Sequence, residues 1–338
     1  MQATQYSLVA DIGGTNARFA LVADATSRAI EPRNLRCAEY ETIVDATLAY
    51  LDQVALGKPY QAAISIASPV TGDALNMMNH HWSFSVSETR AALGLRHLKV
   101  LNDYTALALA LPGLRDDQRF QVGEGQGLAG YPIAVLGPGT GLGVSAVAPV
   151  GDHWLPLESE GGHASYGPLN AREQAIIEIM RERLEHVSAE SLVSGRGLTL
   201  IYEVITRLDQ GAGVKLTPGE VSQRALELDC PVAIETLSIF CSILGTVAGN
   251  LALTLGARGG VYIGGGIVLR ILDFFSRSGF RERFEKHGRL TPYLRNIPTY
   301  VINTDYPALA GAVVALGEGY ENVGVVSHDQ GQTISTKV

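Results

Sequence analysis

Three glycine-rich turns are the segments of this chain best suited to binding chemistry. They lie at 11–15, 137–143 and 264–266, and each follows a short apolar run. A backbone without Cβ atoms can direct several N–H groups at one anion, so such turns often hold phosphate. A single turn of this kind is more simply a tight hairpin or a close helix contact. Three of them, two with the same Gly-Thr pair, favour phosphate binding.

The common nucleotide-binding motifs do not explain these turns. Gly57-Lys58 is followed by Pro59 and lacks the upstream glycine, so the chain has no Walker A loop. The segment 125–130 matches G-x-G-x-x-G, but Pro132 and a β-type run follow where a dinucleotide fold requires a helix. We interpret this match as accidental and expect neither a P-loop NTPase nor a Rossmann dehydrogenase.

Polar candidates lie close to several of the expected elements. Asn102-Asp103 ends an apolar run, where ligands of α/β sheets bind, although Asn and Asp are also preferred helix N-caps. Glu190 lies near Ser188 and would equally suit a helix N-terminus. Glu160 and His163 flank two glycines without a zinc-binding pattern, and a lone histidine is more often structural. The residues alone leave binding and structural roles open at these positions.

The elements that position these residues begin with two similar hairpins. The first turn joins the apolar runs 6–10 and 19–22, and the second joins 133–136 to 144–147. The Gly-Thr pairs of the two turns lie 125 residues apart, which is the size of a domain. This spacing suggests two related halves.

Strands and helices alternate around the hairpins, which predicts an α/β fold with a more helical second half. The expected strands are 62–67, 97–101 and 261–263, and the expected helices are 105–111, 171–184, one starting at 188 and one over 236–257. The last of these is uncharged, but Gly245, Gly249 and several hydroxyls suit close packing inside a protein better than a membrane span. From Ser327 on, the chain is expected to fray.

The composition indicates a globular protein with a small-molecule partner. The 338 residues suggest about two domains. Hydrophobic residues make up 46%, and Lys+Arg 26 against Asp+Glu 34 gives a net charge of -8, which opposes disorder and a nucleic-acid partner. Three cysteines without a CxxC pair oppose a disulfide framework or a cysteine zinc site. Because the N-terminus shows no signal-peptide pattern, we expect a cytoplasmic protein without a membrane partner.

Several segments, taken in order, resemble one known family: the bacterial ATP-dependent glucokinases that lack the ROK signature. These segments are 11–18, 78–82, 101–106, 137–143, 160–163, 186–190 and 264–268. Each is weak alone, but together their order and spacing cover nearly the whole chain. The family belongs to the actin-like sugar kinase superfamily, whose duplicated halves would account for the repeated hairpin.

The resemblance implies a duplicated α/β fold of the actin-like ATPase (ribonuclease H-like) type. A small α/β domain would comprise 1–113 and about 304–338, and a larger α+β domain would comprise about 114–303. The sugar and ATP would occupy the interdomain cleft. Family members are commonly homodimers, so a homodimer is expected.

The implied reaction transfers a phosphoryl group from ATP, with Mg²⁺, to the 6-hydroxyl of glucose. Asp103 corresponds to the catalytic base, and Asn102, Asp103, Glu160, His163 and Glu190 correspond to the residues that bind the sugar. The residues expected at ATP are Ala10, Asp11, Ile12, Gly13, Gly14, Thr15, Gly137, Gly139, Thr140, Gly141, Gly264 and Gly265. Asp11 would also hold Mg²⁺, directly or through water. Pro138 departs from a simple phosphate turn because it lacks an N–H.

Three alternatives compete with this prediction. A kinase for another hexose, such as fructose or mannose, is the most serious, because a motif does not reveal hydroxyl stereochemistry. A sugar-sensing regulator of the ROK type would need a helix-turn-helix, and nothing before Asp11 could form one. A chaperone-like ATPase would need a peptide-binding domain that 338 residues do not accommodate.

Overall fold

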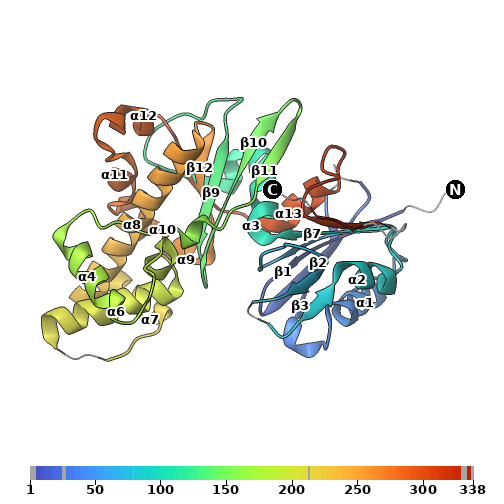
Figure 1. The fold of residues 1–338 in the computed structure, drawn as a ribbon, viewed down its shortest axis with the longest axis horizontal. Coiled ribbons are helices and arrows are strands. Elements are labelled where there is room, and N and C mark those ends of the chain that lie inside the picture. Colours follow the sequence, from blue (N-terminus) through green and yellow to red (C-terminus); the bar gives the residue numbers. More distant parts are fainter. Residues whose placement is uncertain (1–4, 25–27, 79, 212–213, 329–332, 336–338) are drawn as a thin grey trace. The chain divides into compact units, whose positions relative to one another are not determined.

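The structure is a computed structural model, and it describes residues 5–24, 28–78, 80–211, 214–328 and 333–335. The chain divides into two compact units. Unit 1 comprises Met1–Leu114, Val147–Glu158 and Thr304–Val338, and unit 2 comprises Arg115–Ala146 and Ser159–Asn303. Each contains strands with helices packed against them (Figure 1). This division into compact units does not test the domain boundaries expected from the sequence, which stay a prediction.

Unit 1 is built on a seven-stranded sheet with the order β15-β14-β7-β4-β1-β2-β3. Its strands are β1 (Ser7–Ile12), β2 (Asn16–Val22), β3 (Ile30–Arg36), β4 (Gln61–Ile66), β7 (His97–Asn102), β14 (Val325–His328) and β15 (Thr333–Ser335). The three central strands β1, β4 and β7 run parallel, with Ile12 opposite Ile66 and Ile66 opposite Asn102. The end of β1 and the end of β7 therefore lie at the same edge of this sheet.

Helices cover both faces of the unit 1 sheet. Successive side chains of β1 point to opposite faces, and both sets are apolar and buried. Leu8 belongs to the core under α1 (Ile43–Val54) and α2 (Val86–Leu93), whereas Val9 belongs to the cluster under α13 (Pro307–Ala315). Helix α13 packs tightly on α3 (Asp103–Ala110) (Figure 1). A Cβ atom at Gly311 would overlap the carbonyl oxygen of Ala106, so this contact requires glycine. A small two-stranded sheet, β5 (Ala74–Asn76) with β6 (Ser83–Ser85), completes the unit.

The second sheet has the order β11-β10-β9-β12-β13-β8. Its strands are β8 (Arg119–Val122), β9 (Ile133–Pro138), β10 (Leu142–Val150), β11 (His153–Leu157), β12 (Gly260–Ile263) and β13 (Thr299–Ile302), of which β11 and the end of β10 fall in segments assigned to unit 1. Strands β9 and β12 run parallel with Leu136 opposite Ile263. The turns that follow these two strands therefore share one edge.

The longest helix of unit 2, α8 (Pro231–Leu255), packs against α6 (Gly195–Gln210), α7 (Pro218–Leu226) and α11 (Phe280–Glu285). Cβ atoms at Gly245 and Gly249 would overlap or crowd backbone oxygens of α11, which confirms the expected close packing. Among the described helices, α8 is the one long and apolar enough to span a membrane, and 67% of its most apolar window is buried. Such burial is typical of a core helix. The remaining helices are α4 (Ala171–Arg181), α5 (Ala189–Leu192), α9 (Gly266–Arg270), α10 (Leu272–Arg277) and α12 (Thr291–Arg295).

Both expected hairpins are confirmed, and the alternation of strands and helices confirms the α/β class. The prediction that the chain frays from Ser327 is wrong for Ser327 and His328, which end β14 in register with β7, and for β15 beyond them. Ser327 and His328 are ordered because the backbone of β14 pairs with β7, although both side chains are polar. Part of that tail (329–332 and 336–338) and Asn79 of the 78–82 segment lie outside the described residues.

Candidate active site

The first glycine turn joins β1 to β2 and carries a largely buried carboxylate. Asp11 accepts hydrogen bonds from Ser65 Oγ at 3.1 Å and from Arg18 Nη1 at 3.1 Å, and its side chain is 14% exposed. Burial raises the pKa of Asp11, although Arg18 and Ser65 oppose that shift. The turn closes on itself through Gly13 N, which donates to Asn16 O at 2.9 Å. Asp11 therefore lies one residue before the end of β1, next to the glycine turn.

The residues around Asp11 fit a magnesium ion held mainly by a nucleotide. No group of three or more His, Cys, Asp or Glu side chains in the described part of the chain could form a metal cage. Mg²⁺ does not need one, because it commonly binds one or two carboxylates together with phosphates and waters. The carboxylate of Asp11 is a suitable hard oxygen donor. The neighbouring Ala10 and Ile12 bury their side chains, so only their backbone could contact a ligand.

Asn102 and Asp103 lie where β7 ends and α3 begins. Asn102 Oδ1 accepts from Tyr104 N at 2.9 Å and from Thr105 N at 3.2 Å, which is a helix N-cap. Its amide nitrogen donates to Ser68 O at 3.3 Å, so one amide hydrogen remains for another partner. The structure thus shows the capping role that the sequence left open. Asp103 is half-buried at the first position of α3, at the same sheet edge as the first turn.

The second glycine turn joins β9 to β10 and is surrounded by other parts of unit 2. Gly139 N donates to Gly141 O at 2.8 Å, and Gly139 O accepts from Gly195 N at 2.9 Å. Leu142 N donates to the carboxylate of Glu190 at 2.9 Å, and a Cβ atom at Gly141 would overlap that same carboxylate. Glu190, in the first turn of α5, therefore rests directly on this glycine turn.

His163 and Glu190 lie close together within unit 2. His163 Nε2 is 3.9 Å from Glu190 Oε2, and their side chains are 56% and 31% exposed. His163 belongs to a short 3₁₀ turn that begins after Glu160, whose carbonyl accepts from His163 N at 2.9 Å. A Cβ atom at Gly162 would overlap Leu142 O, so glycine lets this turn approach the start of β10. The structure thus brings His163, Glu190 and the second glycine turn together.

The third glycine turn follows β12 and touches the second turn. Gly264 N donates to Leu136 O at 2.9 Å, and Gly265, at φ +84, allows an approach to Pro138 that a side chain would block. Beyond it lies a cavity of about 340 Å³. The cavity is lined by Leu198, Pro218, Gly219, Ser222, Gln223, Leu226, Glu227, Ile267, Arg270 and Ile271, from α6, α7 and the α9 region. None of these residues was predicted from the sequence, because a helix position has the same residue type whether it faces a core, solvent or a cavity.

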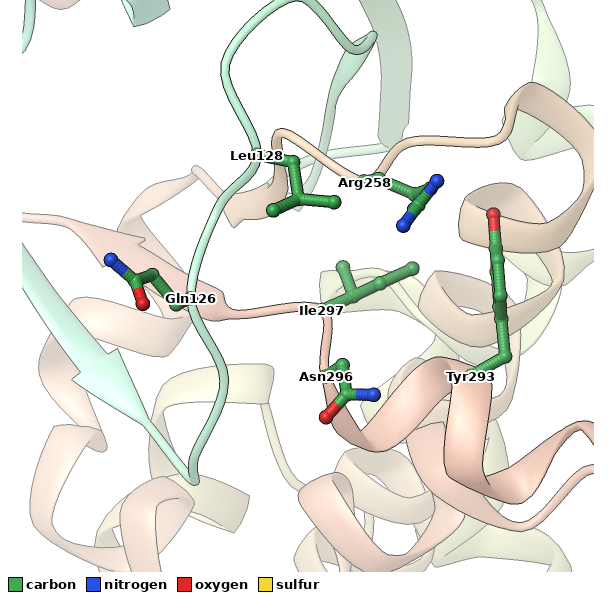
Figure 2. Close-up of a pocket in the computed structure, with 6 residues that line it drawn as sticks. All are labelled: Gln126, Leu128, Arg258, Tyr293, Asn296 and Ile297. Carbon is green, nitrogen blue, oxygen red and sulfur yellow. The ribbon is translucent and has the colours of Figure 1, made fainter.

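A second cavity of about 340 Å³ lies elsewhere in unit 2 and contains no predicted site residue (Figure 2). It is lined by Gln126, Leu128, Arg258, Tyr293, Asn296 and Ile297. The G-x-G-x-x-G segment forms part of its wall through Gln126 and Leu128, while Gly125 and Gly127 pack directly against the backbone near Ile297 and Gly259. No helix follows this segment, since β9 begins at Ile133. The absence of a helix agrees with the interpretation of the match as accidental, and the glycines of the motif serve close backbone packing.

The glucokinase family profile matches residues 8–318 of this chain. The chain belongs to the glucokinase family. It is 49% identical over 310 residues to a glucokinase of Aromatoleum aromaticum, and the matched region covers 91% of this chain and 94% of that protein. It is 47% identical to a bifunctional protein glk of Paraburkholderia xenovorans over 93% of this chain. This family member spans 49% of that longer relative.

Among solved structures, a glucokinase from an Antarctic psychrotroph matches this glucokinase family member with a TM-score of 0.84 and 34% identity. The match covers 92% of this chain and 98% of the other. The likeness confirms the actin-like kinase fold expected from the sequence. As a member of a kinase family, the chain is an ATP-using phosphotransferase.

Proposed function

We propose that this chain transfers the γ-phosphoryl group of ATP to the 6-hydroxyl of glucose, giving glucose 6-phosphate and ADP. One observation carries the proposal: Glu190 rests on the second glycine turn while it lies 3.9 Å from His163. Groups suited to sugar hydroxyls thus adjoin a turn suited to phosphate. The 49% identity to a glucokinase favours this reaction over a sugar-sensing regulator.

Asp103 is proposed as the general base that accepts the proton of the attacking hydroxyl. Phosphoryl transfer depends mainly on positioning and charge stabilisation, and a carboxylate at the nucleophile orients the hydroxyl. The capped start of α3 suits this role, because Asn102 fixes the backbone that carries Asp103. The Tyr104 N–H contacts Asp103 Oδ1 at 2.9 Å, which further orients the carboxylate.

Asn102, Glu160, His163 and Glu190 are proposed to bind the other hydroxyls of the sugar. Carboxylates are strong acceptors for an uncharged polyol, and Asn and His can donate or accept. A sugar that lacks one of these hydroxyls would leave a site group unpaired, so it should be rejected steeply. The preferred hexose is therefore the one whose hydroxyl groups can all bond to these four side chains.

The nucleotide is proposed to bind along the three glycine turns. The residues 10–15 and 137–141 would hold the β- and γ-phosphates, and Gly264 and Gly265 would lie near adenosine, with the adenine in the α6–α7–α9 cavity. The apolar side chains there, Leu198, Ile267 and Ile271, suit a purine face. Asp11 would hold Mg²⁺, which, when bound, offsets phosphate charge.

The family resemblance also suggests a cytoplasmic homodimer, and analytical ultracentrifugation would refute the dimer if the chain sediments as a monomer.

A coupled ADP-release assay across a panel of hexoses, with ATP and Mg²⁺, tests the reaction and the substrate together. Glucose should have the highest kcat/KM. Asp103→Asn should lower kcat by about 10²-fold or more, while glucose binding measured by calorimetry survives. Asp52→Asn, an exposed position in the same unit, is the matched control. A preference for another hexose, or an Asp103→Asn variant with normal kcat, would contradict the proposal.

The same assay tests the adenine cavity with two cavity-filling variants. Ser222→Trp should raise the KM for ATP while the KM for glucose stays unchanged, because the indole would occupy the space proposed for adenine. Leu128→Trp fills the other cavity, of similar volume, and should leave the KM for ATP unchanged. An equal rise of the KM for ATP in both variants would show that the cavity is not the adenine site.

A further inference from the structure

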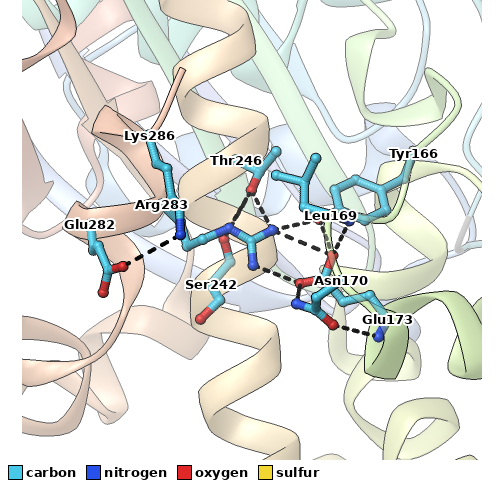
Figure 3. A network of polar contacts seen from close by, with 9 residues as sticks. All are labelled: Tyr166, Leu169, Asn170, Glu173, Ser242, Thr246, Glu282, Arg283 and Lys286. Atoms are coloured by element: carbon cyan, nitrogen blue, oxygen red, sulfur yellow. Dashed lines mark hydrogen bonds and ion pairs between the residues drawn. The ribbon is translucent and has the colours of Figure 1, made fainter. Parts of the chain in front are cut away.

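A buried ion pair joins two helices of unit 2, α4 and α11 (Figure 3). Arg283 Nη1 of α11 donates to Glu173 Oε1 of α4 at 2.7 Å, and the two side chains are 12% and 2% exposed. Neither residue figures in the proposed reaction. A pair held this deeply needs further hydrogen bonds to offset the loss of hydration.

Glu173 has donors at both carboxylate oxygens. Oε1 accepts from Asn170 Nδ2 at 2.8 Å as well as from Arg283, while Oε2 accepts from Tyr166 Oη and from Leu169 N, both at 2.9 Å. Burial alone would raise the pKa of Glu173, but the hydrogen bonds from Arg283, Leu169 N and Tyr166 outweigh it and hold the pKa below its usual value. The carboxylate is therefore ionised at neutral pH and fixed in direction.

Arg283 extends the same network to a third helix and to the same tyrosine. Its Nε and Nη2 donate to Thr246 Oγ1 of α8 at 3.2 and 2.9 Å. Its Nη2 also donates to Tyr166 Oη at 3.2 Å. Tyr166, 6% exposed, is thus held through its hydroxyl by both members of the ion pair.

Tyr166 lies three residues after His163, and its backbone connects the two segments proposed to bind sugar. Tyr166 N donates to Val187 O at 3.3 Å, and Ala189 N donates to Ala164 O at 2.9 Å. An isolated β-bridge pairs the residues between them, and Glu190 follows at once. A shift of Tyr166 would therefore move the segments that carry His163 and Glu190 together.

We propose that the Glu173–Arg283 pair positions the sugar-binding segments 160–166 and 187–190 through the hydroxyl of Tyr166. This inference rests on the proposed function. An apolar cluster of equal size would hold three helices together as well as an ion pair does. The polar network in addition fixes the position of the Tyr166 side chain, because its hydroxyl can bond Glu173 and Arg283 at once in only one orientation. His163 and Glu190 are 56% and 31% exposed, and besides the bond from Leu142 N to Glu190, the buried Tyr166 is the proposed anchor of the segments that carry them.

Tyr166→Phe is the sharpest test, because it removes one hydroxyl and keeps the ring. We expect the KM for glucose, and the Kd from calorimetry without ATP, to rise about 3- to 10-fold, as loss of a buried hydrogen bond implies. The KM for ATP and kcat should stay within about twofold. Glu173→Gln should act in the same direction, and the double variant should be less than additive, because both changes break the same link.

Arg172→Met is the matched control on the same helix. Arg172 precedes Glu173, but its guanidinium pairs with Asp209 and Glu235 outside the network, so the KM for glucose should not change. A Tyr166→Phe variant with normal glucose affinity, or with an equal rise of the KM for ATP, would overturn the inference. A wild-type chain that phosphorylates no hexose would refute the proposed function, and this inference with it. An active wild type with an unchanged Tyr166→Phe variant refutes the inference alone.

Discussion

The two Gly-Thr turns of this chain share a local pattern but obtain their carboxylate from different places. In the first turn, Asp11 of the strand itself supplies it, and Arg18 and Ser65 hold it. In the second turn, buried Leu136 stands at the corresponding position, and Glu190 reaches the turn from a separate helix. The same short sequence pattern thus lies in two different chemical environments.

The difference shows how one repeated turn can serve two purposes. Because the carboxylate of the first turn is intrinsic, that turn can specialise in the nucleotide and its metal ion. The carboxylate of Glu190 at the second turn also lies 3.9 Å from His163, so this turn adjoins both phosphate and sugar in the proposed reaction. Changes in the first turn should therefore affect ATP use alone, whereas changes in the second should also affect the sugar.

The largest effect is expected at Asp11. Asp11→Asn should lower kcat by about 100-fold and raise the Mg²⁺ concentration needed for half-maximal rate, because it removes the proposed anchor of the ion. Burial raises the pKa of Asp11, so the folded state disfavours the ionised form, and neutral Asn should not lower the melting temperature. Initial rates measured over a range of Mg²⁺ concentrations check the first expectation, and thermal unfolding checks the second. A variant with an unchanged Mg²⁺ dependence would remove the distinction between the turns.

An intermediate effect is expected from adding a methyl group to each turn. Gly141→Ala would displace the carboxylate of Glu190 from Leu142 N and should raise the KM for glucose about tenfold. At Gly13 the nearest atom to an added Cβ is Asn16 O at 3.7 Å, an ordinary contact. Gly13→Ala should therefore keep the turn intact and leave the KM for glucose within about twofold, and any effect should fall on the KM for ATP, whose phosphates are proposed to lie beside this turn. Equal glucose effects in the two variants would contradict the comparison.

The smallest effect is expected at Pro138, which corresponds to Gly13 of the first turn. Gly13 N is used inside its own hairpin, so the N–H that proline lacks is not one that the first turn offers to a ligand. Pro138→Ala should change the KM for ATP by less than about twofold and lower the free energy of unfolding by about 0.4–1 kcal/mol, because the unfolded chain becomes more flexible. Steady-state kinetics and urea unfolding measure both. A large fall in the KM for ATP would show that a donor at 138 reaches the nucleotide.

Much of the fold could be predicted because its signals are local. Apolar runs broken by glycine or proline identified β1, β4, β7, β9 and β12 within one or two residues. Strand β3 escaped notice, because it is an almost wholly exposed edge strand that lacks an apolar alternation and contains Pro32. The C-terminal strands were missed for a related reason, since the pairing of β14 with β7 and of β15 with β14 is not visible in their own residues.

The sequence by itself determined the family, the two hairpins and the identity of the candidate site residues, since each depends on a short run of residue types. Only the tertiary structure decided which of them meet. Glu190 reaches Leu142 across 48 residues, and Arg283 reaches Glu173 across 110. Residue periodicity shows which face of an element is buried, but not which partner covers it. Such long-range contacts form only when the helices pack, so the anchor at Tyr166 emerged from the folded chain alone.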